Sequence, residues 1–360
     1  MTKNEMLLFK ELCNIRSESF DSSLIDYASP TVLGQLFYNR MQAASYLCLR
    51  KHGLLSKVNR EFRNALKGAY EQNKVKNESF YQCIKYLNKS LSGCKCKYAM
   101  LKGALLCKIY PEGCRTSNDI DLLVMPEDVT EIGKALLSSG FVQGNIRNDE
   151  FKPASRKEII ESRMTRGETI PYVKEVNLPG MRYLEVDINF SLDYKSGDKN
   201  ALQKMLSRAC TVKTDGLKIP SLDAPDFIIH LCAHLYKEAA TLPWVEMKRD
   251  MSLYKYCDIY LLLSKMSDVN IDDIFERAAD MGMEKMCAYA ILQADAFFPM
   301  NRYAVSMAEN ILLSEPSFLH TVYSPSDKKI YIYTQTDVFK RFFNKDRTKL
   351  LREVESNAAT

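Results

Sequence analysis

The chain has 360 residues, of which 26% are charged and 46% are hydrophobic, and its formal net charge at pH 7 is +5. This is the profile of an ordinary globular protein with room for two or three domain-sized units. The positive charge is spread along the chain, so it permits an anionic small substrate but does not indicate a nucleic-acid binder.

The cysteine pattern predicts reduced thiols rather than disulfides. Eleven cysteines are an odd number, and several, such as Cys107 and Cys232, lie in apolar helical stretches. Cys94 and Cys96 are too close for a normal zinc knuckle, and no second pair follows at a suitable spacing. The N-terminus lacks the apolar core of a signal peptide, and no apolar run of about eighteen residues exists. We therefore expect a cytoplasmic protein without a membrane span.

Residues 1–95 are predicted to be helical. Ser29-Pro30 marks the start of a helix that we expect to end at Gly53. A second long helical pattern covers about 54–91, and Ser92-Gly93 ends it. We treat 1–95 as an N-terminal helical region.

Residues 96–195 change to a mixed pattern of strands and helices, which we interpret as an α/β core. The segment 143–168 is polar and basic, and we interpret it as a mobile loop or an insertion. Pro179-Gly180 is a turn between two alternating stretches and predicts a β-hairpin. The other predicted elements are a strand at 98–101, a helix at 103–110, a strand at 119–125 and a helix at 126–140.

Residues 196–360 return to helical patterns and form the predicted C-terminal helical region. The alternating stretch 328–343 is the exception and indicates a strand. The predicted helices are 200–209, 223–240, 246–266, 271–282, 284–298 and 303–313. The expected fold class is therefore α+β, with a small mixed sheet between two helical regions.

Two aspartates in the α/β core carry the main chemical signal. Asp119 and Asp121 are two residues apart on an apolar strand, so their side chains share one face. In the later strand, Asp187 alternates with apolar residues and gives a third carboxylate on an open sheet face. Carboxylates gathered in this way repel one another unless a cation lies between them. Mg²⁺, a hard ion that takes oxygen ligands, is the expected occupant.

The turn that precedes the first aspartate adds a predicted phosphate site. Gly103 lies between a strand and the start of a helix, where backbone N–H groups favour a phosphate. Lys102 or Arg115 would add positive charge toward a triphosphate. Phosphoryl and nucleotidyl transfer need metal ions that polarise the phosphate and neutralise the leaving group, and the three aspartates would hold them.

The stretch LKGALLCKIYPEGCRTSNDIDLLVMPEDV resembles the bacterial family of uncharacterised nucleotidyltransferases, within the polymerase-β-like superfamily. The resemblance covers about 75–300 and is most specific over 98–142. It implies a polymerase-β-like core and transfer of NMP from an NTP to an acceptor hydroxyl with release of pyrophosphate. ATP is the preferred candidate for the NTP. The resemblance also implies two Mg²⁺ ions, with Mn²⁺ as an alternative, bound by Asp119, Asp121 and Asp187.

Two positions depart from the family pattern. Ala104 stands where the superfamily has Gly or Ser, so a hydroxyl contact to the γ-phosphate is missing. Asn189 stands where the family has a histidine. By the same resemblance, Lys255 and Asp258, three residues apart on a later helix, line the nucleotide site, with Lys255 touching a phosphate. A plain ion pair on the helix surface is the alternative interpretation of these two residues.

Other features have simpler interpretations. His230 and His234 are four residues apart, but buried hydrogen-bonded histidines are favoured over a metal pair. Trp244 is expected to fill a core rather than stack on a base. The basic residues over 147–166 favour a solvated loop over a substrate clamp.

The preferred hypothesis is a Mg²⁺-dependent nucleotidyltransferase. A second hypothesis is a catalytically silent nucleotide-binding or interaction protein on the same fold. A third takes Asp-Ile-Asp as the metal motif of a sugar-nucleotide glycosyltransferase, but residues 1–95 look helical where such an enzyme needs a nucleotide domain. The acceptor remains open among a small molecule, a sugar, a protein side chain and RNA.

Overall fold

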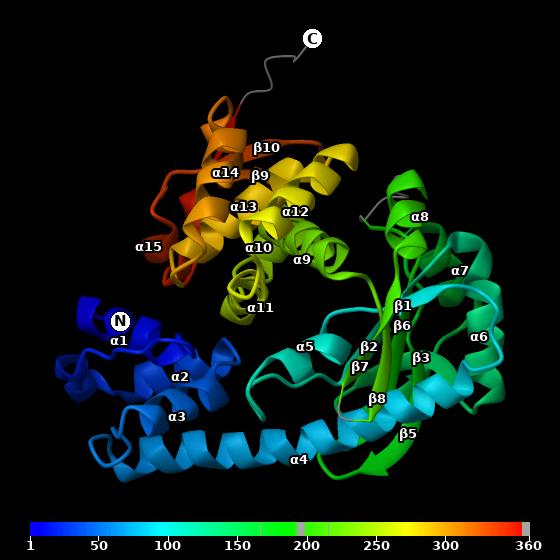
Figure 1. Cartoon of the computed structure of the whole chain (residues 1–360), viewed down its shortest axis with the longest axis horizontal. Helices are drawn as coiled ribbons and strands as arrows, with labels where there is room; N and C mark the ends of the chain where they lie inside the picture. The colour runs from blue at the N-terminus through cyan, green and yellow to red at the C-terminus, as the bar shows by residue number, and fades with distance from the viewer. Residues whose placement is uncertain (166, 193–198, 215, 355–360) are drawn as a thin grey trace. The chain divides into compact units, whose positions relative to one another are not determined.

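The computed structural model describes residues 1–165, 167–192, 199–214 and 216–354 and has mixed α and β structure (Figure 1). Its residues group into two units, one formed by Gly68–Phe227 and the other by Met1–Lys67 with Ile228–Thr360. Each unit is described by itself. The domain boundaries predicted near residues 95 and 195 stay predictions.

The unit 68–227 is built around a six-stranded mixed sheet with the strand order β1-β2-β6-β5-β3-β4. Strands β2 and β6 pair in parallel, and the other neighbours pair antiparallel. Its elements are α4 (Arg60–Ser90, from residue 68), β1 (Tyr98–Met100), α5 (Gly103–Ile109), β2 (Asp119–Val124), α6 (Val129–Ser138), β3 (Val142–Arg147), β4 (Glu150–Pro153), α7 (Arg156–Thr165), β5 (Tyr172–Leu178), β6 (Met181–Asn189), α8 (Lys199–Ser207), β7 (Cys210–Thr214) and β8 (Leu217–Ser221).

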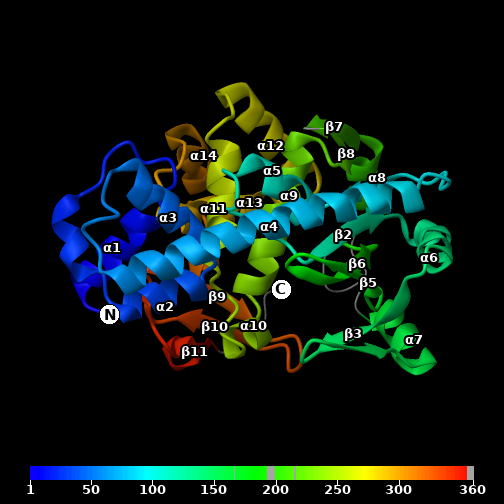
Figure 2. The ribbon, with the colours of Figure 1, turned by 90° about the horizontal axis from the view of Figure 1, so that it is seen from below.

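One face of this sheet is covered by helices α4, α5 and α6, which can be followed with the strands in Figures 1 and 2. The core joins inward-facing residues of β2 and β6, such as Leu122 and Val186, to apolar residues of α4, such as Phe80 and Ile84. Because side chains alternate along a strand, this packing leaves the intervening residues of β2 and β6 on the opposite face. The carboxylates predicted from the sequence lie on that opposite face.

The hairpin predicted at Pro179-Gly180 is confirmed. Strands β5 and β6 pair antiparallel around it, and Gly180 has a φ of +71°, a conformation that favours glycine. Ser79 of α4 donates a hydrogen bond to the carbonyl oxygen of Pro179 at 2.7 Å. The hairpin end is therefore tied to the helix that covers the other sheet face.

Of the two interpretations of 143–168, a mobile loop or an insertion, the mobile loop is wrong for most of that segment. Strands β3 and β4 form a hairpin there, with Asn148 and Asp149 at positive φ in its turn, and α7 follows. Asn and Asp tolerate the left-handed conformation because their short side chains bond locally. Arg166, counted among the basic residues of this segment, lies outside the described residues.

One long predicted helix is divided in two, and another is shorter than predicted. The first consists of α2 (Pro30–Tyr38) and α3 (Gln42–Lys51), with Arg40 at a φ of +57° between them. The predicted helix 246–266 is shortened to α11 (Leu253–Leu263), and Lys248, at a φ of +60°, lies between it and α10 (Leu242–Glu246). A left-handed residue ends a helix, but it is marked in sequence only when it is glycine or asparagine. The β7–β8 hairpin was also not predicted.

The unit formed by 1–67 and 228–360 is mainly helical, with the three-stranded sheet β11-β10-β9. Its interior holds a cluster of phenylalanines, in which the Phe297 and Phe342 ring centroids are 4.8 Å apart. The remaining elements are α1 (Lys3–Cys13), α9 (Ala224–Ala239, from residue 228), α12 (Asp268–Asp280), α13 (Glu284–Asp295), α14 (Arg302–Leu312), β9 (Thr321–Tyr323), β10 (Ile330–Tyr333), α15 (Val338–Phe342) and β11 (Leu351–Val354).

A buried ion pair joins the last described part of the chain to the connection between α10 and α11. Arg347 donates two hydrogen bonds to Asp250, at 2.7 and 2.5 Å, and Tyr333 donates a third to the same carboxylate at 3.2 Å. Asp250 and Arg347 are 4% and 7% exposed, so both charges are desolvated. Replacing one residue of the pair would therefore leave the other as an unpaired buried charge.

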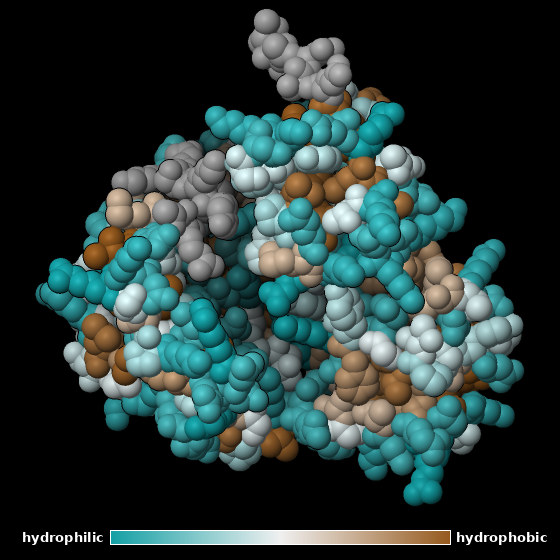
Figure 3. All heavy atoms as spheres, turned by 180° about the vertical axis from the view of Figure 1, so that it is seen from behind, coloured by the Kyte–Doolittle hydropathy of each residue, from teal (hydrophilic) through white to brown (hydrophobic). Residues whose placement is uncertain are grey.

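The face in Figure 3 is mainly hydrophilic, and its hydrophobic residues lie in smaller groups. Scattered apolar residues of this kind are normal on a protein surface. Over the part of the chain that the structure describes, no helix is both long and apolar enough to cross a bilayer.

Candidate functional site

The parallel pairing of β2 with β6 brings the predicted aspartates together. Asp121 lies directly beside Asp187 in the register of the two strands, and Asp119 lies beside Glu185. Neighbouring residues in a sheet point to the same face, so four carboxylates from two adjacent strands share one surface. Asp121 is buried, and the other three are partly buried.

Each of the two Asp-x-Asp carboxylates has a defined hydrogen-bond donor. Ser117 donates its hydroxyl to Asp119 Oδ1 at 2.7 Å. Lys102 Nζ lies 3.1 Å from Asp121 Oδ1, and the Asn189 side-chain amide donates to the same oxygen at 3.3 Å. Asn189, which stands in place of the family's histidine, is therefore in contact with the aspartate cluster.

The crowding of negative charge perturbs the acids of this face. Burial raises the pKa of the Asp187 carboxyl well above its usual value, and the charges of Asp121 and Asp119 raise it further. Burial and the charge of Asp119 likewise raise the pKa of Glu185. Burial by itself would lower the pKa of Lys102, but Asp121 and Asp119 outweigh it and raise that pKa. The ammonium group therefore partly offsets the repulsion among the acids.

The turn between β1 and α5 places Lys102 in an unusual backbone conformation. Its φ is +46° and its ψ is −115°, a combination that costs free energy for any residue with a Cβ. Strain of this kind is tolerated where the surrounding structure enforces it. Here the next residue, Gly103, is packed tightly: a Cβ added to it would lie 2.4 Å from Ser117 Oγ. Glycine at 103 thus makes room for the serine that bonds Asp119.

The remaining predicted phosphate-binding residues of this unit are placed as follows. Ala104 is fully buried in the core beneath the sheet, and its N–H donates to the carbonyl of Leu101 at 3.3 Å. Arg115 is 8% exposed and donates to the carbonyl of Thr116 at 2.8 Å. Their contact with a phosphate stays a prediction.

Lys255 and Asp258 belong to the other unit, on α11. Lys255 Nζ bonds Glu238 Oε2 of α9, and His234 Nε2 lies 3.1 Å from Glu238 Oε1. The Lys255 side chain is partly buried against Glu238, and Asp258 is 3% exposed. An ion pair between Lys255 and Asp258 stays a prediction. A role beside the nucleotide stays a prediction.

His230 and His234 stack on α9 with ring centroids 6.3 Å apart. This arrangement follows from their spacing of four residues on one helix face. His234 faces Glu238, and His230 is buried. Both histidines are thus packed within a helical unit, His234 is paired with Glu238, and a hydrogen bond of His230 stays a prediction.

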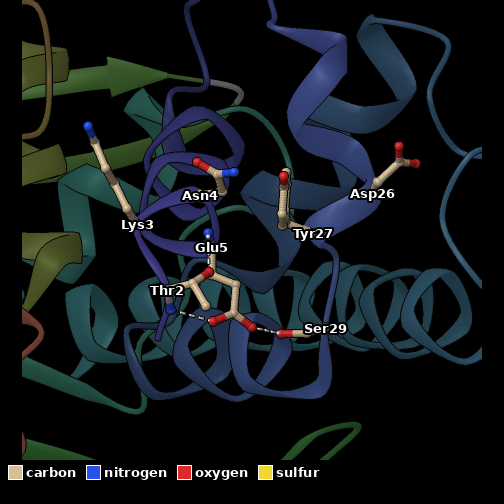
Figure 4. Close-up of a pocket in the computed structure, with 7 residues that line it drawn as sticks. All are labelled: Thr2, Lys3, Asn4, Glu5, Asp26, Tyr27 and Ser29. Carbon is tan, nitrogen blue, oxygen red and sulfur yellow. Dashed lines mark hydrogen bonds between the residues drawn. The ribbon is translucent and has the colours of Figure 1, made fainter.

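The cavity shown in Figure 4 lies at the N-terminus, within the other unit, and holds about 470 Å³. Glu5 points toward Thr2 and Ser29, whose donors lie 2.7 and 2.5 Å from its carboxylate oxygens. The hydrogen bond from Ser29 lowers the pKa of Glu5. With Thr2 this forms a capping box for α1, so the acid serves the helix start.

A second group of possible metal ligands lies at the start of α6. One ligand atom from each of Cys96, Asp128 and Glu131 lies within 4.8 Å of the others. Burial and the two carboxylates raise the pKa of Cys96 to about 11, which favours the protonated thiol. The backbone N–H of Lys95 donates to Glu131 at 2.7 Å, so this carboxylate is already engaged in fixing the segment.

Three residues of the acidic face were not assigned from sequence. Ser117 and Glu168 carry no local signal, since each lies in a connection between elements. Glu185 alternates with the apolar residues of its strand, as Asp187 does, and this pattern places it on the same face. Reading every polar residue of that strand as a candidate would have found it.

The donor set of this face suits a hard divalent cation. Carboxylate oxygens are the ligands that Mg²⁺ and Mn²⁺ take, and several converge from β2 and β6 with Lys102 as the neighbouring ammonium. The carboxylates outnumber that ammonium, because Asp119, Asp121, Asp187 and Glu185 lie on one face beside Lys102. Asp119, Asp121 and Asp187 therefore fit the role of ion ligands.

The sequence profile of a family described as "Uncharacterised nucleotidyltransferase" matches residues 30–299. No significant match was found among curated proteins. Among solved structures, a similar chain is an antigenic nucleotidyltransferase-like protein from Paracoccidioides brasiliensis. It is 12% identical, has a TM-score of 0.34, and the match covers 58% of this chain and 92% of that one. The family match spans most of the chain and is the finding that assigns it.

Proposed function

This chain belongs to the uncharacterised nucleotidyltransferase family, and we propose that it transfers NMP from an NTP to an acceptor hydroxyl, with ATP as the preferred candidate for the NTP. The acceptor oxygen would form a bond to the α-phosphorus while the bond from that phosphorus to the bridging oxygen breaks. Pyrophosphate leaves, and the hydroxyl proton passes to a base or to solvent. The α/β unit would be a core of the polymerase-β-like kind.

The observation that carries this proposal is the register of β2 and β6. Asp121 and Asp187 come from distant parts of the chain and lie side by side, with Asp119 on the same face. Such a cluster costs electrostatic free energy, because like charges that lie close together repel one another. A divalent cation would offset this cost, and the family assignment supplies a reaction that uses one.

In this proposal Asp119, Asp121 and Asp187 hold Mg²⁺, with two ions expected and Mn²⁺ as an alternative. When bound, the ions would polarise the phosphate and neutralise the leaving pyrophosphate. Ser117 orients Asp119, and Asn189 orients Asp121. These hydrogen bonds would fix the carboxylates before the nucleotide arrives.

Lys102 would exchange its partner when the nucleotide binds. Its ammonium lies on Asp121 in the structure, and a cation on that carboxylate would leave it available to a phosphate oxygen. Gly103, Ala104 and Arg115 complete the proposed phosphate region. The resemblance to the family also proposes Lys255 and Asp258 of α11 as nucleotide-binding residues.

The test is incubation with α-³²P-labelled NTPs and a cell extract, which asks which NTP labels which molecule. Asp121→Asn is expected to abolish labelling and to weaken Mg²⁺–NTP binding while the fold remains. The matched control is Asp149→Asn, because Asp149 is exposed in the β3–β4 turn at a φ of +59°, which asparagine also adopts. Full labelling activity in Asp121→Asn would refute the proposal.

The alternative is a nucleotide-binding protein without catalysis on the same fold. Calorimetry with Mg²⁺ and each NTP separates the two when it is combined with a pyrophosphate assay. Nucleotide binding without pyrophosphate release, across a broad panel of acceptors, would favour the silent protein.

A further inference from the structure

We propose that Glu168 is a further carboxylate ligand of the cation site, supplied by the connection between α7 and β5. The proposal rests on the proposed function, because it assumes that the acidic face of β2 and β6 holds a divalent cation. Glu168 lies at the end of the segment predicted to be a mobile loop, and no sequence motif marks it.

Backbone pairing fixes the position of Glu168 beside β6. Glu168 forms an antiparallel bridge with Asn189. The Thr169 N–H donates to the carbonyl of Ile188, and the Phe190 N–H donates to the carbonyl of Gly167, each at 2.9 Å. These two bonds flank the bridge, so Glu168 and Asn189 are a non-hydrogen-bonded pair, the kind whose Cα atoms are about 4.5 Å apart and whose side chains are closest.

This register decides which face Glu168 occupies. Residues directly opposite each other in an antiparallel pair point to the same face. Asn189 points to the acidic face, since its amide donates to Asp121 at 3.3 Å. Glu168 therefore lies on the acidic face, diagonal to Asp187, which is two residues before Asn189 in β6. In agreement, the charge of Glu168 is among the causes that raise the pKa of Asp187.

The segment that carries Glu168 is held in place by buried contacts. Ser162 of α7 donates its hydroxyl to the carbonyl oxygen of Glu168 at 3.0 Å. Ser162 and Thr169 are each 3% exposed, and Glu168 is itself partly buried. A ligand must be positioned by a rigid support, and this backbone is anchored on both sides.

The chemistry of the side chain suits this role. Glu168 has one methylene more than an aspartate. From its position beside β6 its carboxylate can therefore extend toward a cation that Asp121 and Asp187 would hold. Gathering another carboxylate onto a face that already carries Asp119, Asp121 and Asp187 costs free energy unless a cation is bound there. The cost is offset when divalent ions occupy the face.

The test measures Mn²⁺ binding to the full chain without nucleotide, using the electron paramagnetic resonance signal of the unbound ion. Glu168→Gln is expected to weaken Mn²⁺ binding by about tenfold or more, as loss of a group that supports a metal site does. The matched control, Glu150→Gln, changes an exposed glutamate of β4 and should leave Mn²⁺ binding unchanged. Glu168→Asp, which keeps the charge but shortens the side chain, should give an intermediate affinity.

Unchanged Mn²⁺ affinity in a folded Glu168→Gln variant would overturn the proposal. If the glutamine variant does not fold, wild-type affinity in Glu168→Asp overturns it instead, since the shorter acid cannot make the same contact. Asp121→Asn distinguishes this failure from failure of the proposed function. Loss of Mn²⁺ binding in Asp121→Asn with no effect of Glu168→Gln would reject only Glu168, whereas full binding and labelling in Asp121→Asn would reject the proposed function.

Discussion

Replacing Lys102 by methionine tests how the acidic face is balanced. The change removes the ammonium and keeps an unbranched side chain of similar length. In the wild type, Nζ is 3.1 Å from Asp121 Oδ1, and the two side chains are 25% and 11% exposed. At an effective dielectric constant of about 20, this separation corresponds to an attraction of about 5 kcal/mol. Desolvation of both groups offsets most of it, so the net contribution is about 1–3 kcal/mol.

We therefore expect Lys102→Met to lower the free energy of unfolding by about 1–3 kcal/mol when no divalent cation is present. Mg²⁺ or Mn²⁺ should stabilise the variant more than the wild type, because the bound ion no longer competes with an ammonium for Asp121. Urea denaturation without cation, and with cation at roughly 100 times its dissociation constant, would measure both effects.

Lys102→Gly is the matched control for backbone strain. Glycine also removes the charge, but it accepts the φ of +46° without a penalty, which offsets about 1 kcal/mol of the loss. Lys102→Gly should therefore be more stable than Lys102→Met. Equal stability of Lys102→Met and the wild type, together with the same response to cation, would refute the counter-ion role of Lys102.

Three further predictions concern other parts of the chain. Gly103→Ala places a Cβ 2.4 Å from a serine oxygen and should lower the free energy of unfolding by about 1–3 kcal/mol. The control is Gly68→Ala in α4, where the added Cβ would have no atom within 4 Å and should raise the free energy of unfolding by about 0.4–1 kcal/mol. Burial and the adjacent Arg341 guanidinium lower the pKa of His320. The unfolded chain therefore binds the proton more readily, and the wild type should lose stability as the pH falls from about 6.5 toward that lower pKa. His320→Gln should flatten this dependence when denaturation is measured at pH 5–8. Arg347→Met breaks the buried ion pair and should cost about 3–5 kcal/mol, whereas Lys329→Met, in an exposed pair, should cost at most about 1 kcal/mol in the same urea titration.

Each of these predictions has a result that contradicts it. Equal effects of the two glycine substitutions would mean that the contact at residue 103 relaxes freely. A pH dependence that survives in His320→Gln would assign it to another group. Equal losses of unfolding free energy in Arg347→Met and Lys329→Met would mean that burial does not make one ion pair more stabilising than the other.

The sheet face and the three aspartates could be predicted because both depend on local alternation. Along β2 and β6 the apolar residues recur at every second position, and this period places Asp119, Asp121 and Asp187 on the face opposite the core. What could not be predicted was their pairing, since no local pattern states that β2 and β6 are neighbours or that residue 121 aligns with residue 187. Alternation alone would allow other alignments.

The features that sequence did not predict are those fixed by distant partners. Lys255 meets Glu238 from a different helix, and Glu168 takes its place from a bridge to β6. The breaks at Arg40 and Lys248 are left-handed residues that carry a full side chain, so the usual glycine signal of a helix end is missing. In each case tertiary structure overrides the local preference.

The parallel register of β2 and β6 also has a consequence for how the protein folds. The two strands are far apart in the sequence, so joining them costs loop-closure entropy before any contact repays it. Their acidic residues repel as the strands approach, whereas the apolar residues on the other face favour the encounter. Cations that shield the carboxylates should therefore speed refolding, and the divalent ions proposed for this face would also assist the step that assembles it.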